Sequence, residues 1–488
     1  MSWFDYDMIV IGGGAAGLTV TAGAAQLGAR TLLVEREEAL GGDCLHYGCV
    51  PSKTLIRTAR LYHQMKNSSY YGLPSVEVPE VDFSQVRERI RDVIATIEEH
   101  DSPKRFCSLG AKVVFGGAEF VNEHEISVDG RRYSGKKICV ATGSGPAIPH
   151  INGLNDVSYH TNKTIFFMDR LPERLIILGG GAIAIEMAQA FSRLGSQVTV
   201  CQRSERILTR EDPDCAHLIQ GVLEGEGVKF LLGTKVRSVA KTPDGGIGVN
   251  VHLASTGKEV VVEGDTLLVA LGRSANLDGL SLENAGVEFD RRGIDVDARL
   301  RTSRKHIFAA GDVIGKYQFT HAAGYEGGIV VANAIFRLPR KVDYTFMPRC
   351  IYTDPELATV GLTEAECLEM GIDFEVIKEP FSANDRAITE GATTGFIKLI
   401  IGENGRPVGV QILGPHAGDL LSHWMVALNG RVKPSTVAQA IHPYPTFGEI
   451  NKKVMGNLVS RWLFSDTMKR GLKFFFNLKG RACGIEEQ

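Results

Sequence analysis

Two cysteines with four residues between them, Cys44 and Cys49, form the most reactive pattern in this chain of 488 residues. They lie in residues 41–53, which read Gly-Gly-Asp-Cys-Leu-His-Tyr-Gly-Cys-Val-Pro-Ser-Lys. When a helix begins at the second cysteine, its free backbone N–H groups and its dipole stabilise a thiolate and keep the pair reactive. The pattern predicts a thiol pair that alternates between disulfide and dithiol and so carries electrons.

A glycine-rich turn before the cysteines predicts a nucleotide site. Residues 7–17 form an apolar strand that runs into a turn, and a small-residue helix (residues 18–27) and a second strand follow. The glycines of the turn are Gly12, Gly14 and Gly17. They permit a tight turn and a close approach to a pyrophosphate, and Glu35 at the end of the second strand can accept hydrogen bonds from a ribose. Cys44 follows Glu35 by nine residues, so a bound redox cofactor would lie against the thiol pair.

Residues 174–184 repeat this unit, followed by a helix to residue 194 and a strand to residue 201. Gly179 and Gly181 repeat the spacing of Gly12 and Gly14 in the first turn. Here Gln202 stands where the acidic residue would be, which removes the repulsion of a 2′-phosphate. Cations that can pair with that phosphate follow at Arg203, Arg206 and Arg210. The second site is therefore expected to take NADPH, with NADH as the alternative.

Two later segments are expected to return to the first sheet. Residues 137–145 read as a buried strand that ends in a loop with Thr142 and Gly143, and residues 305–313 read as another strand. Asp312 follows that strand at its carboxyl end, where ligands bind in such sheets. From residue 341 the pattern changes to strands and amphipathic helices without a glycine turn. The sequence predicts an α/β fold with two Rossmann-like dinucleotide-binding domains and a third, α+β domain.

Composition excludes several classes of protein. The net charge of −3 gives no electrostatic reason to expect a nucleic acid partner. No segment approaches the roughly 20 apolar residues of a membrane span, and the N-terminus has no signal-peptide pattern. The nine cysteines are an odd number and are scattered, unlike a secreted disulfide framework, and several, such as Cys139, are expected to be small buried apolar residues. We expect a cytoplasmic protein.

Together these residues resemble the pyridine nucleotide–disulfide oxidoreductases, flavoenzymes that include glutathione reductase, dihydrolipoyl dehydrogenase and mercuric reductase. The resemblance covers about residues 5–455. It implies FAD in the first site, a nicotinamide nucleotide in the second and a homodimer formed by the C-terminal domain. The expected parts are an FAD-binding domain (1–148), an NAD(P)-binding domain (149–270), a return to the FAD-binding domain (271–340), a dimerisation domain (341–460) and a tail (461–488).

The resemblance also assigns roles to residues. Cys49 would be the thiol against the flavin, and Cys44 the interchange thiol that meets the substrate. Lys53 and Glu186 would form a pair near flavin N5. Lys53 lies one helical turn after Cys49, so both can share a face, where an ammonium would stabilise charge on the reduced flavin. The residues expected to hold FAD include Gly42 of the cysteine motif, Thr142, Gly143 and Asp312.

The chain departs from the family at the proton-transfer residue. The family brings a histidine and a glutamate to the thiol pair of the other subunit in a His-Pro-Thr-x-x-Glu pattern. Residues 442–449 read His-Pro-Tyr-Pro-Thr-Phe-Gly-Glu, which puts Tyr444 at the position of the histidine and retains Glu449. A phenol with a reference pKa near 10 is a poor base but can donate a hydrogen bond or ligate a soft metal. His442 is either structural or reaches the same site from an extended segment.

A tyrosine at this position resembles the mercuric reductase branch, although the N-terminal metal-carrying domain of that branch is missing and Cys483 stands alone where the branch has a cysteine pair. The basic and aromatic residues 462–480 can lie on a membrane surface or pack across a dimer. We expect a reductase that passes electrons from NAD(P)H to a disulfide, a metal ion or a small electrophile, without a resident metal. The alternatives are a dihydrolipoyl dehydrogenase and a redox-sensing flavoprotein with a membrane- or partner-binding tail.

Overall fold

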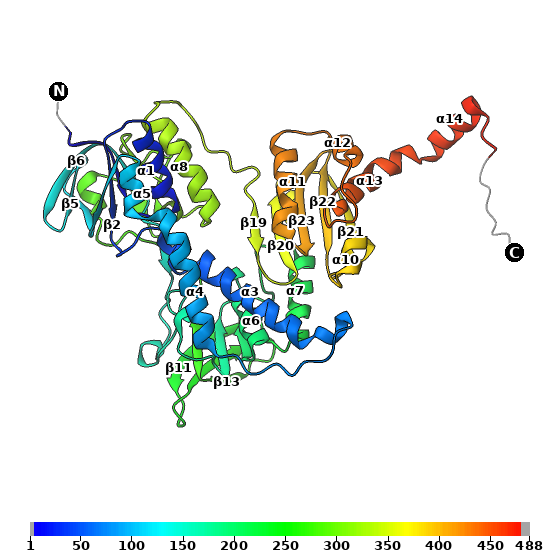
Figure 1. Cartoon of the computed structure of the whole chain (residues 1–488), viewed down its shortest axis with the longest axis horizontal. Coiled ribbons are helices and arrows are strands. Elements are labelled where there is room, and N and C mark those ends of the chain that lie inside the picture. The colour runs from blue at the N-terminus through cyan, green and yellow to red at the C-terminus, as the bar shows by residue number, and fades with distance from the viewer. Residues whose placement is uncertain (1–3, 480–488) are drawn as a thin grey trace. The chain divides into compact units, whose positions relative to one another are not determined.

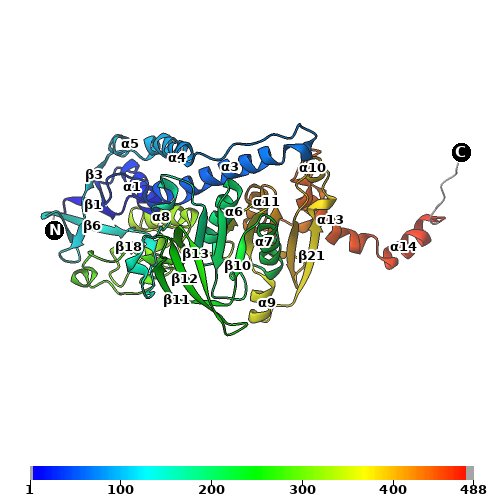
Figure 2. The ribbon, with the colours of Figure 1, turned by 90° about the horizontal axis from the view of Figure 1, so that it is seen from below.

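The computed structural model describes residues 4–479, and the chain forms two compact units. Unit 1 consists of Met1–Thr209 and Gln220–Tyr344. Unit 2 consists of Arg210–Ile219 and Thr345–Gln488. Figures 1 and 2 show the elements of both units from two directions. Within residues 4–479, no helix has the length and apolar character needed to cross a membrane.

The first sheet of unit 1 has the arrangement predicted from the first glycine turn. Its parallel strands follow the order β3-β2-β1-β6, and β18 pairs with β6. These strands are β1 (Tyr6–Ile11), β2 (Thr31–Glu35), β3 (Ala111–Phe115), β6 (Arg131–Val140) and β18 (Ile307–Ala309). The strands β4 (Ala118–Phe120) and β5 (Glu125–Val128) extend it in antiparallel fashion. The returning strands β6 and β18 bury their apolar residues in one core, which includes Cys139.

Two helices cover one face of this sheet side by side, α1 (Ala15–Gln26) and α8 (Thr320–Ala334) (Figures 1 and 2). The first begins at Ala15, directly after Gly14, and so three residues earlier than predicted. Small side chains make the approach close, since a Cβ atom added at Gly23 would lie 2.8 Å from a methyl carbon of Val331. Close packing of this kind explains why the first helix consists mainly of alanine and glycine.

The second sheet of unit 1 comes from the second glycine turn and is also parallel. Its order is β10-β9-β8-β14. The strands are β8 (Arg174–Leu178), β9 (Gln197–Cys201), β10 (Lys229–Leu231) and β14 (Thr266–Val269), with α6 (Ala182–Leu194) between the first two. A three-stranded antiparallel sheet follows, formed by β11 (Thr234–Lys241), β12 (Ile247–Leu253) and β13 (Glu259–Gly264). The two parallel sheets confirm the predicted α/β fold class.

Unit 1 also contains further helices, two pairs of short strands and several 3₁₀ turns. The helices are α2 (Gly42–His46), α3 (Cys49–Lys66), α4 (Phe83–Glu98) and α5 (Pro103–Ser108). The short strands are β7 (Ser144–Pro146), which pairs with β15 (Arg273–Ala275), and β16 (Phe289–Asp290), which pairs with β17 (Gly293–Ile294). The single 3₁₀ turns are η1 (Ser68–Tyr71), η2 (Glu99–Asp101), η3 (Leu154–Asp156), η4 (Ile165–Phe167), η5 (Leu282–Ala285) and η6 (Asp312–Ile314).

Unit 2 is an antiparallel sheet with helices, as the α+β prediction requires. The strand order is β19-β20-β23-β22-β21. The strands are β19 (Arg349–Ile351), β20 (Glu356–Gly361), β21 (Phe374–Pro380), β22 (Phe396–Gly402) and β23 (Pro407–Gly414). The helices are α9 (Glu364–Met370), α10 (Asp385–Thr389), α11 (Ala417–Asn429), α12 (Pro434–Gln439), α13 (Glu449–Leu463) and α14 (Asp466–Phe476), with the turn η7 (Phe381–Ala383). Its core contains the fully buried Trp424 and Phe381.

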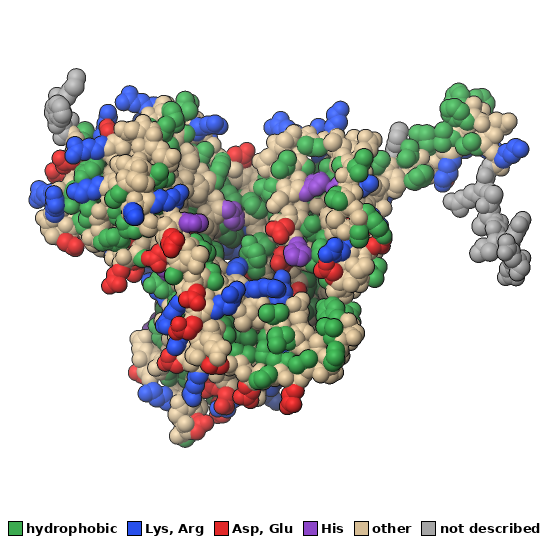
Figure 3. All heavy atoms as spheres, viewed as in Figure 1, with side chains coloured by type: hydrophobic (Ala, Val, Ile, Leu, Met, Phe, Trp, Pro, Cys, Tyr) green, Lys and Arg blue, Asp and Glu red, His purple; other side chains and the backbone are tan. Residues whose placement is uncertain are grey.

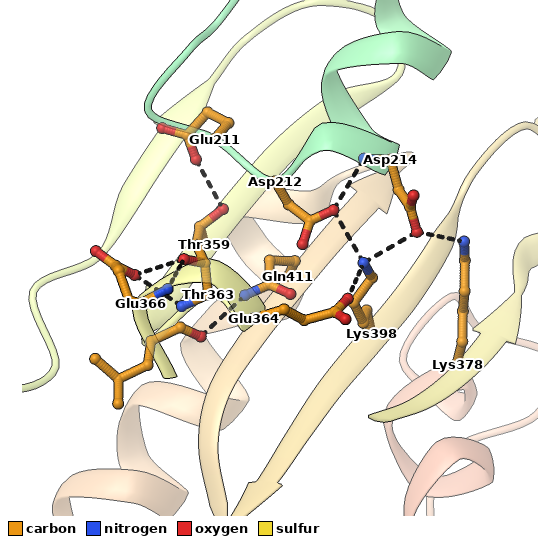
Figure 4. A network of polar contacts seen from close by, with 11 residues as sticks. Glu211, Asp212, Asp214, Thr359, Thr363, Glu364, Glu366, Lys378, Lys398 and Gln411 are labelled. Atoms are coloured by element: carbon orange, nitrogen blue, oxygen red, sulfur yellow. Dashed lines mark hydrogen bonds and ion pairs between the residues drawn. The ribbon is translucent and has the colours of Figure 1, made fainter. Parts of the chain in front are cut away.

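A buried lysine fastens residues 210–219 to the sheet of unit 2 (Figure 4). This segment includes the first half of α7 (Pro213–Gly225). The ammonium of Lys398 on β22 lies 2.9 Å from Asp212, 3.0 Å from Asp214 and 2.7 Å from Glu364. Burial by itself lowers the pKa of Lys398, but the three carboxylates outweigh it and raise that pKa above its ordinary value. The ammonium takes the place a metal ion would need among these three carboxylates, so the cluster is structural.

Candidate active site

The first glycine turn leaves the backbone room that a dinucleotide requires. Gly12 has φ +109°, and a Cβ atom there would lie 2.3 Å from the carbonyl oxygen of Ala141. A Cβ atom at Gly17 would lie 1.8 Å from the carbonyl oxygen of Gly12, whereas one at Gly14 would meet only Gly42, at 3.9 Å. The turn is thus closed toward the protein and open at Gly14, at the start of α1, where a pyrophosphate binds in this type of turn.

Two carboxylates lie at the ends of strands in the first sheet. Glu35, at the end of β2, is buried and accepts hydrogen bonds from the backbone N–H of Gly13 (2.5 Å) and of Glu37 (2.7 Å). Asp312 follows β18, accepts a hydrogen bond of 2.6 Å from the Ser144 hydroxyl, and has its pKa raised by burial. The Glu35 carboxylate retains acceptor capacity for a ribose. These residues and the open turn fit FAD.

The loop after β6 is fixed by two hydrogen bonds. The Thr142 hydroxyl donates to the carbonyl of Asn276 at 2.8 Å, and the Asn276 amide donates to the carbonyl of Thr142 at 2.9 Å. Gly143 follows with φ +70°. The sequence placed Thr142 and Gly143 near the cofactor, and the structure shows that their loop is held in one position by residues from the return segment.

The second glycine turn has the same construction. A Cβ atom at Gly179 would lie 2.3 Å from the carbonyl oxygen of Ala270, whereas one at Gly181 would meet nothing within 4 Å. Gln202 lies under the turn, close to Gly180. Arg203 is exposed, and the Arg206 guanidinium donates to the carbonyl of Thr209 at 2.9 Å. The turn fits a second dinucleotide, and the exposed Arg203 lies two residues past the end of β9.

The two cysteines lie on consecutive helices, and the pKa values of their thiols are shifted in opposite directions. Cys44 is in α2, and Cys49 is the first residue of α3, as predicted. Neither is part of a disulfide in this structure. A hydrogen bond with Cys44 lowers the pKa of Cys49 to about 6 against the effect of burial, and the Thr320 hydroxyl and the Lys53 ammonium act in the same direction. The same hydrogen bond, with burial, raises the pKa of Cys44. At neutral pH Cys49 is therefore the thiolate and Cys44 holds the proton.

Lys53 and Glu186 form the predicted pair. Their side chains join α3 to α6 through a contact of 2.8 Å between Lys53 Nζ and Glu186 Oε2. Glu186 is buried, whereas the Lys53 side chain is about one third exposed. The glutamate fixes the ammonium one turn below Cys49, where its charge stabilises the thiolate.

Sequence reasoning missed Thr320, which contacts the reactive thiolate. Its Oγ1 atom lies 3.4 Å from Cys49 Sγ, and it is the first residue of α8. The hydroxyl donates to the thiolate, and the helix dipole adds positive potential at the same point. Thr320 is 271 positions from Cys49 in the sequence, so no local pattern links the two residues. A hydroxyl residue at the start of a helix could nevertheless have been noted as an anion-binding position.

Replacing Thr320 with valine is expected to raise the pKa of Cys49 by roughly one unit, because a hydrogen bond to a charged group of about 1.5 kcal/mol is lost. The pH dependence of alkylation at Cys49, in a Cys44→Ser background, measures this pKa. Thr320→Ser keeps the hydroxyl and should leave the pKa near its original value. Equal pKa values in the valine and serine variants would show that the contact does not stabilise the thiolate.

Arg273 was also missed and connects the cysteine motif to Ser144 and Asp312. Its guanidinium lies 2.9 Å from Asp43, next to Cys44, and donates to the Ser144 hydroxyl at 2.8 Å. The same group lies 3.7 Å from Asp312. These contacts tie the helix that carries Cys44 to β7 and to the turn η6 after β18. The only feature of the sequence that pointed to Arg273 was its position after the strand that leaves the second sheet.

The three residues expected at the proton-transfer position lie in unit 2. The Tyr444 hydroxyl is exposed and donates to Asp385 at 3.0 Å, and this hydrogen bond raises the pKa of Tyr444. The His442 ring stacks on His423 with 5.4 Å between the ring centres. Glu449 begins α13 and accepts a hydrogen bond of 3.4 Å from the backbone N–H of Thr446. Within this unit the three side chains thus have separate partners. Cys483 lies outside the described residues.

Comparison with known proteins identifies the family to which the chain belongs. A family model described as pyridine nucleotide-disulphide oxidoreductase matches residues 6–327, and a model of the dimerisation domain of the same proteins matches residues 347–455. The chain is 34% identical to a mercuric reductase of Staphylococcus aureus over 447 residues, which are 91% of this chain and 81% of that protein. It is 34% identical to a dihydrolipoyl dehydrogenase of Bacillus subtilis over 462 residues, 91% and 96% of the two chains.

Among solved structures, the HOCl-induced flavoprotein disulfide reductase RclA from Escherichia coli superposes with a TM-score of 0.82 at 28% identity. The match covers 92% of this chain and 99% of that one. A Cu(II) complex of the same reductase gives the same TM-score over 93% of this chain.

Proposed function

Since the chain belongs to the pyridine nucleotide-disulphide oxidoreductases, flavoenzymes that use FAD and a nicotinamide nucleotide, we propose that it passes electrons from NADPH through Cys44 and Cys49 to a soft metal ion. A disulfide or a small electrophile is the second class of acceptor. The observation that carries the proposal is the pair of unequal thiols with no histidine at the position of the base, which Tyr444 occupies instead.

We also propose that Tyr444 and Glu449 of one subunit face the thiol pair of the other in a homodimer.

Bound FAD would accept a hydride from the nicotinamide and deliver two electrons to the disulfide. The chain's own residues then keep the two thiols distinct. A hydrogen bond with Cys44, together with Thr320 and Lys53, holds Cys49 as the thiolate, and Cys44 keeps a proton because its pKa is raised. A disulfide acceptor requires a base to remove that proton, whereas a soft metal ion displaces thiol protons as it binds. The missing histidine therefore favours a metal ion over a disulfide.

A panel of acceptors tests the proposal. The full-length protein loaded with FAD is supplied with NADPH and with Hg²⁺, Cu²⁺, glutathione disulfide or, in the reverse direction, dihydrolipoamide with NAD⁺. Multiple turnovers with a soft metal ion and slow turnover with the disulfide are expected. Protein that does not bind FAD would overturn the proposal. Stoichiometric reduction without turnover on any acceptor would instead identify a redox-sensing flavoprotein.

The dihydrolipoyl dehydrogenase alternative rests on the similarity to such enzymes. If the base is missing, Tyr444→His should raise the rate of dihydrolipoamide oxidation by on the order of 100-fold, since general base catalysis contributes at least that much. Tyr444→Phe removes the phenol without adding a base and should leave this rate low. Fast dihydrolipoamide oxidation by the unmodified protein, with no gain in the histidine variant, would favour the alternative.

Preference for NADPH is proposed from the second glycine turn. Arg203→Ala is expected to raise the KM for NADPH roughly 10-fold and to leave the KM for NADH unchanged, because one charge-assisted hydrogen bond to the 2′-phosphate is lost. Steady-state rates of flavin reduction measure both constants. Arg237→Ala, which removes another exposed arginine of the same unit, is the matched control. Equal effects of Arg203→Ala on both nucleotides would contradict the assignment.

We place the enzyme in the reducing cytoplasm, where a thiol pair of this kind is regenerated by NADPH. We further propose that its C-terminal segment, beyond the dimerisation domain matched at residues 347–455, makes peripheral contact with a membrane.

A further inference from the structure

The helix α14 has an apolar face whose leucine and phenylalanine side chains are exposed within the described chain. Met468, Leu472, Phe475 and Phe476 recur at the spacing i, i+4, i+7 and i+8, which places them on one side of a helix. No residue of α14 is buried. Phe475 and Phe476 are 78% and 70% exposed, and Phe474 beside them is 82% exposed. Figure 3 shows hydrophobic side chains gathered over this C-terminal part of the chain. Exposed aromatic residues in a row are typical of a binding face.

The N-terminus of α14 is capped by its own residues. The Ser465 side chain accepts a hydrogen bond from the backbone N–H of Met468, and Asp466 lies in the first turn. These features stabilise the N-terminus of the helix without help from the rest of unit 2. The amphipathic pattern is therefore presented on a formed helix, and it lies past the end of the matched dimerisation domain at residue 455.

The rest of α14 carries basic residues. Arg470 and Lys473 are exposed and fall on the side away from Phe475, and the exposed Lys469 lies at the edge of the apolar face, next to Phe476. With Lys479 and the single acid Asp466, residues 465–479 carry a net charge of +3, while the whole chain carries −3. The segment thus has the sign of charge that an anionic surface attracts, although the protein as a whole does not.

Charge argues against one occupant of the apolar face, the same helix of a second copy. Pairing with α14 of a second copy would bring two segments of charge +3 together, which is unfavourable at low ionic strength. An anionic bilayer accepts the phenylalanines between its acyl chains and pairs the lysines with its phosphates. The combination of aromatic and basic residues therefore fits a lipid surface and not a second helix of the same kind.

We propose that α14 binds anionic phospholipid headgroups, with Met468, Leu472 and Phe475 inserted among the acyl chains and Lys469 and Lys473 on the phosphates. This inference deepens the membrane contact proposed above and is independent of the electron acceptor. Each lysine or arginine near an anionic bilayer contributes about 1 kcal/mol, and a homodimer presents two such helices, which increases the avidity.

Flotation of the full-length, FAD-loaded protein with vesicles tests the proposal. Vesicles of phosphatidylcholine with phosphatidylglycerol should carry the protein, and vesicles of phosphatidylcholine alone should not. Lys469→Glu with Lys473→Glu should weaken the partition by about 30-fold or more. Leu472→Ser with Phe475→Ser should weaken it by on the order of 100-fold. Lys235→Glu with Lys258→Glu, an equal charge reversal on exposed lysines of unit 1, should have no effect.

Two results would overturn the inference. One is binding that is absent, or equal on neutral and anionic vesicles. The other is an oligomer larger than a dimer, in the absence of lipid, that Leu472→Ser with Phe475→Ser converts to the dimer, which would show that a second copy covers the face. Reduction of the flavin by NADPH is measured on the same samples, so a failure of the proposed redox function is distinguished from a failure of lipid binding.

Discussion

Replacing Cys49 with serine is expected to abolish both turnover and the long-wavelength absorption that a thiolate beside a flavin produces. Serine forms no disulfide, and its hydroxyl is not ionised at neutral pH, so neither electron transfer through the pair nor the thiolate remains. Turnover with any acceptor should fall by at least about 10³-fold, the order of magnitude that loss of a covalent nucleophile costs. Absorption spectra during reduction by NADPH, together with steady-state rates, measure both effects.

Cys44→Ser is the matched control, because it removes the interchange thiol but keeps a hydrogen-bond donor next to Cys49. Turnover should again be lost, whereas the long-wavelength absorption should be retained. Since the pKa of Cys49 is about 6, the thiolate is present above this pH, and the absorption should disappear as the pH falls through it. A midpoint near 9, the ordinary thiol value, or residual turnover in Cys49→Ser would contradict the separate roles of the two cysteines.

The parts of the fold that sequence predicted are those whose signals are local. Both glycine turns, with the strand before and the helix after, follow from a few residues whose spacing is dictated by backbone geometry. The start of α3 at Cys49 was predictable for the same reason, and so was the position of Lys53 one turn later. The first helix begins earlier than expected because Gly14 itself precedes the first helical residue.

The contacts that sequence could not predict join distant segments. Thr320 reaches Cys49 across 271 positions, and Arg273 joins Asp43 to Ser144. No periodicity within either segment encodes which partner the sheet brings near. The proton-transfer position combines a feature that the sequence predicted with one that it could not predict. The tyrosine at position 444 was readable in the sequence, whereas its hydrogen bond to Asp385, which makes the phenol a still poorer base, required the structure.

The attachment of residues 210–219 to unit 2 belongs to the same class of unpredictable contacts. In sequence these residues follow the second glycine turn, yet they group with the C-terminal sheet. A lysine within an apolar strand gave no indication of this, because Lys398 is surrounded in sequence by isoleucine and leucine. Its 2% exposed side chain and the 2% exposed carboxylate of Asp212 make the pair one of the most deeply buried charge contacts of the unit.

Replacing Lys398 with methionine is expected to lower the free energy of unfolding by about 3–5 kcal/mol, because removing one partner leaves the buried Asp212 carboxylate without its counter-charge. The loss corresponds to a decrease of roughly 10 °C in the unfolding temperature of a unit of this size. Differential scanning calorimetry of the FAD-loaded protein measures it. Lys378→Met is the control, since Lys378 is partly exposed and pairs with Asp214 at 3.3 Å, and it should cost less than about 1 kcal/mol.

The effect of Lys398→Met should depend on pH with a definite sign. A hydrogen bond from Lys398 lowers the pKa of Asp214, so the stabilisation from this carboxylate is present above its unfolded pKa of about 4 and is lost as the pH falls below it. The raised pKa of Lys398 extends the stabilisation upward to its unfolded value near 10.5 and beyond. The difference between the two proteins should therefore be constant near neutrality and shrink in acid. If Lys398→Met combined with Asp212→Asn is no more stable than Lys398→Met alone, the cost does not come from the unpaired carboxylate.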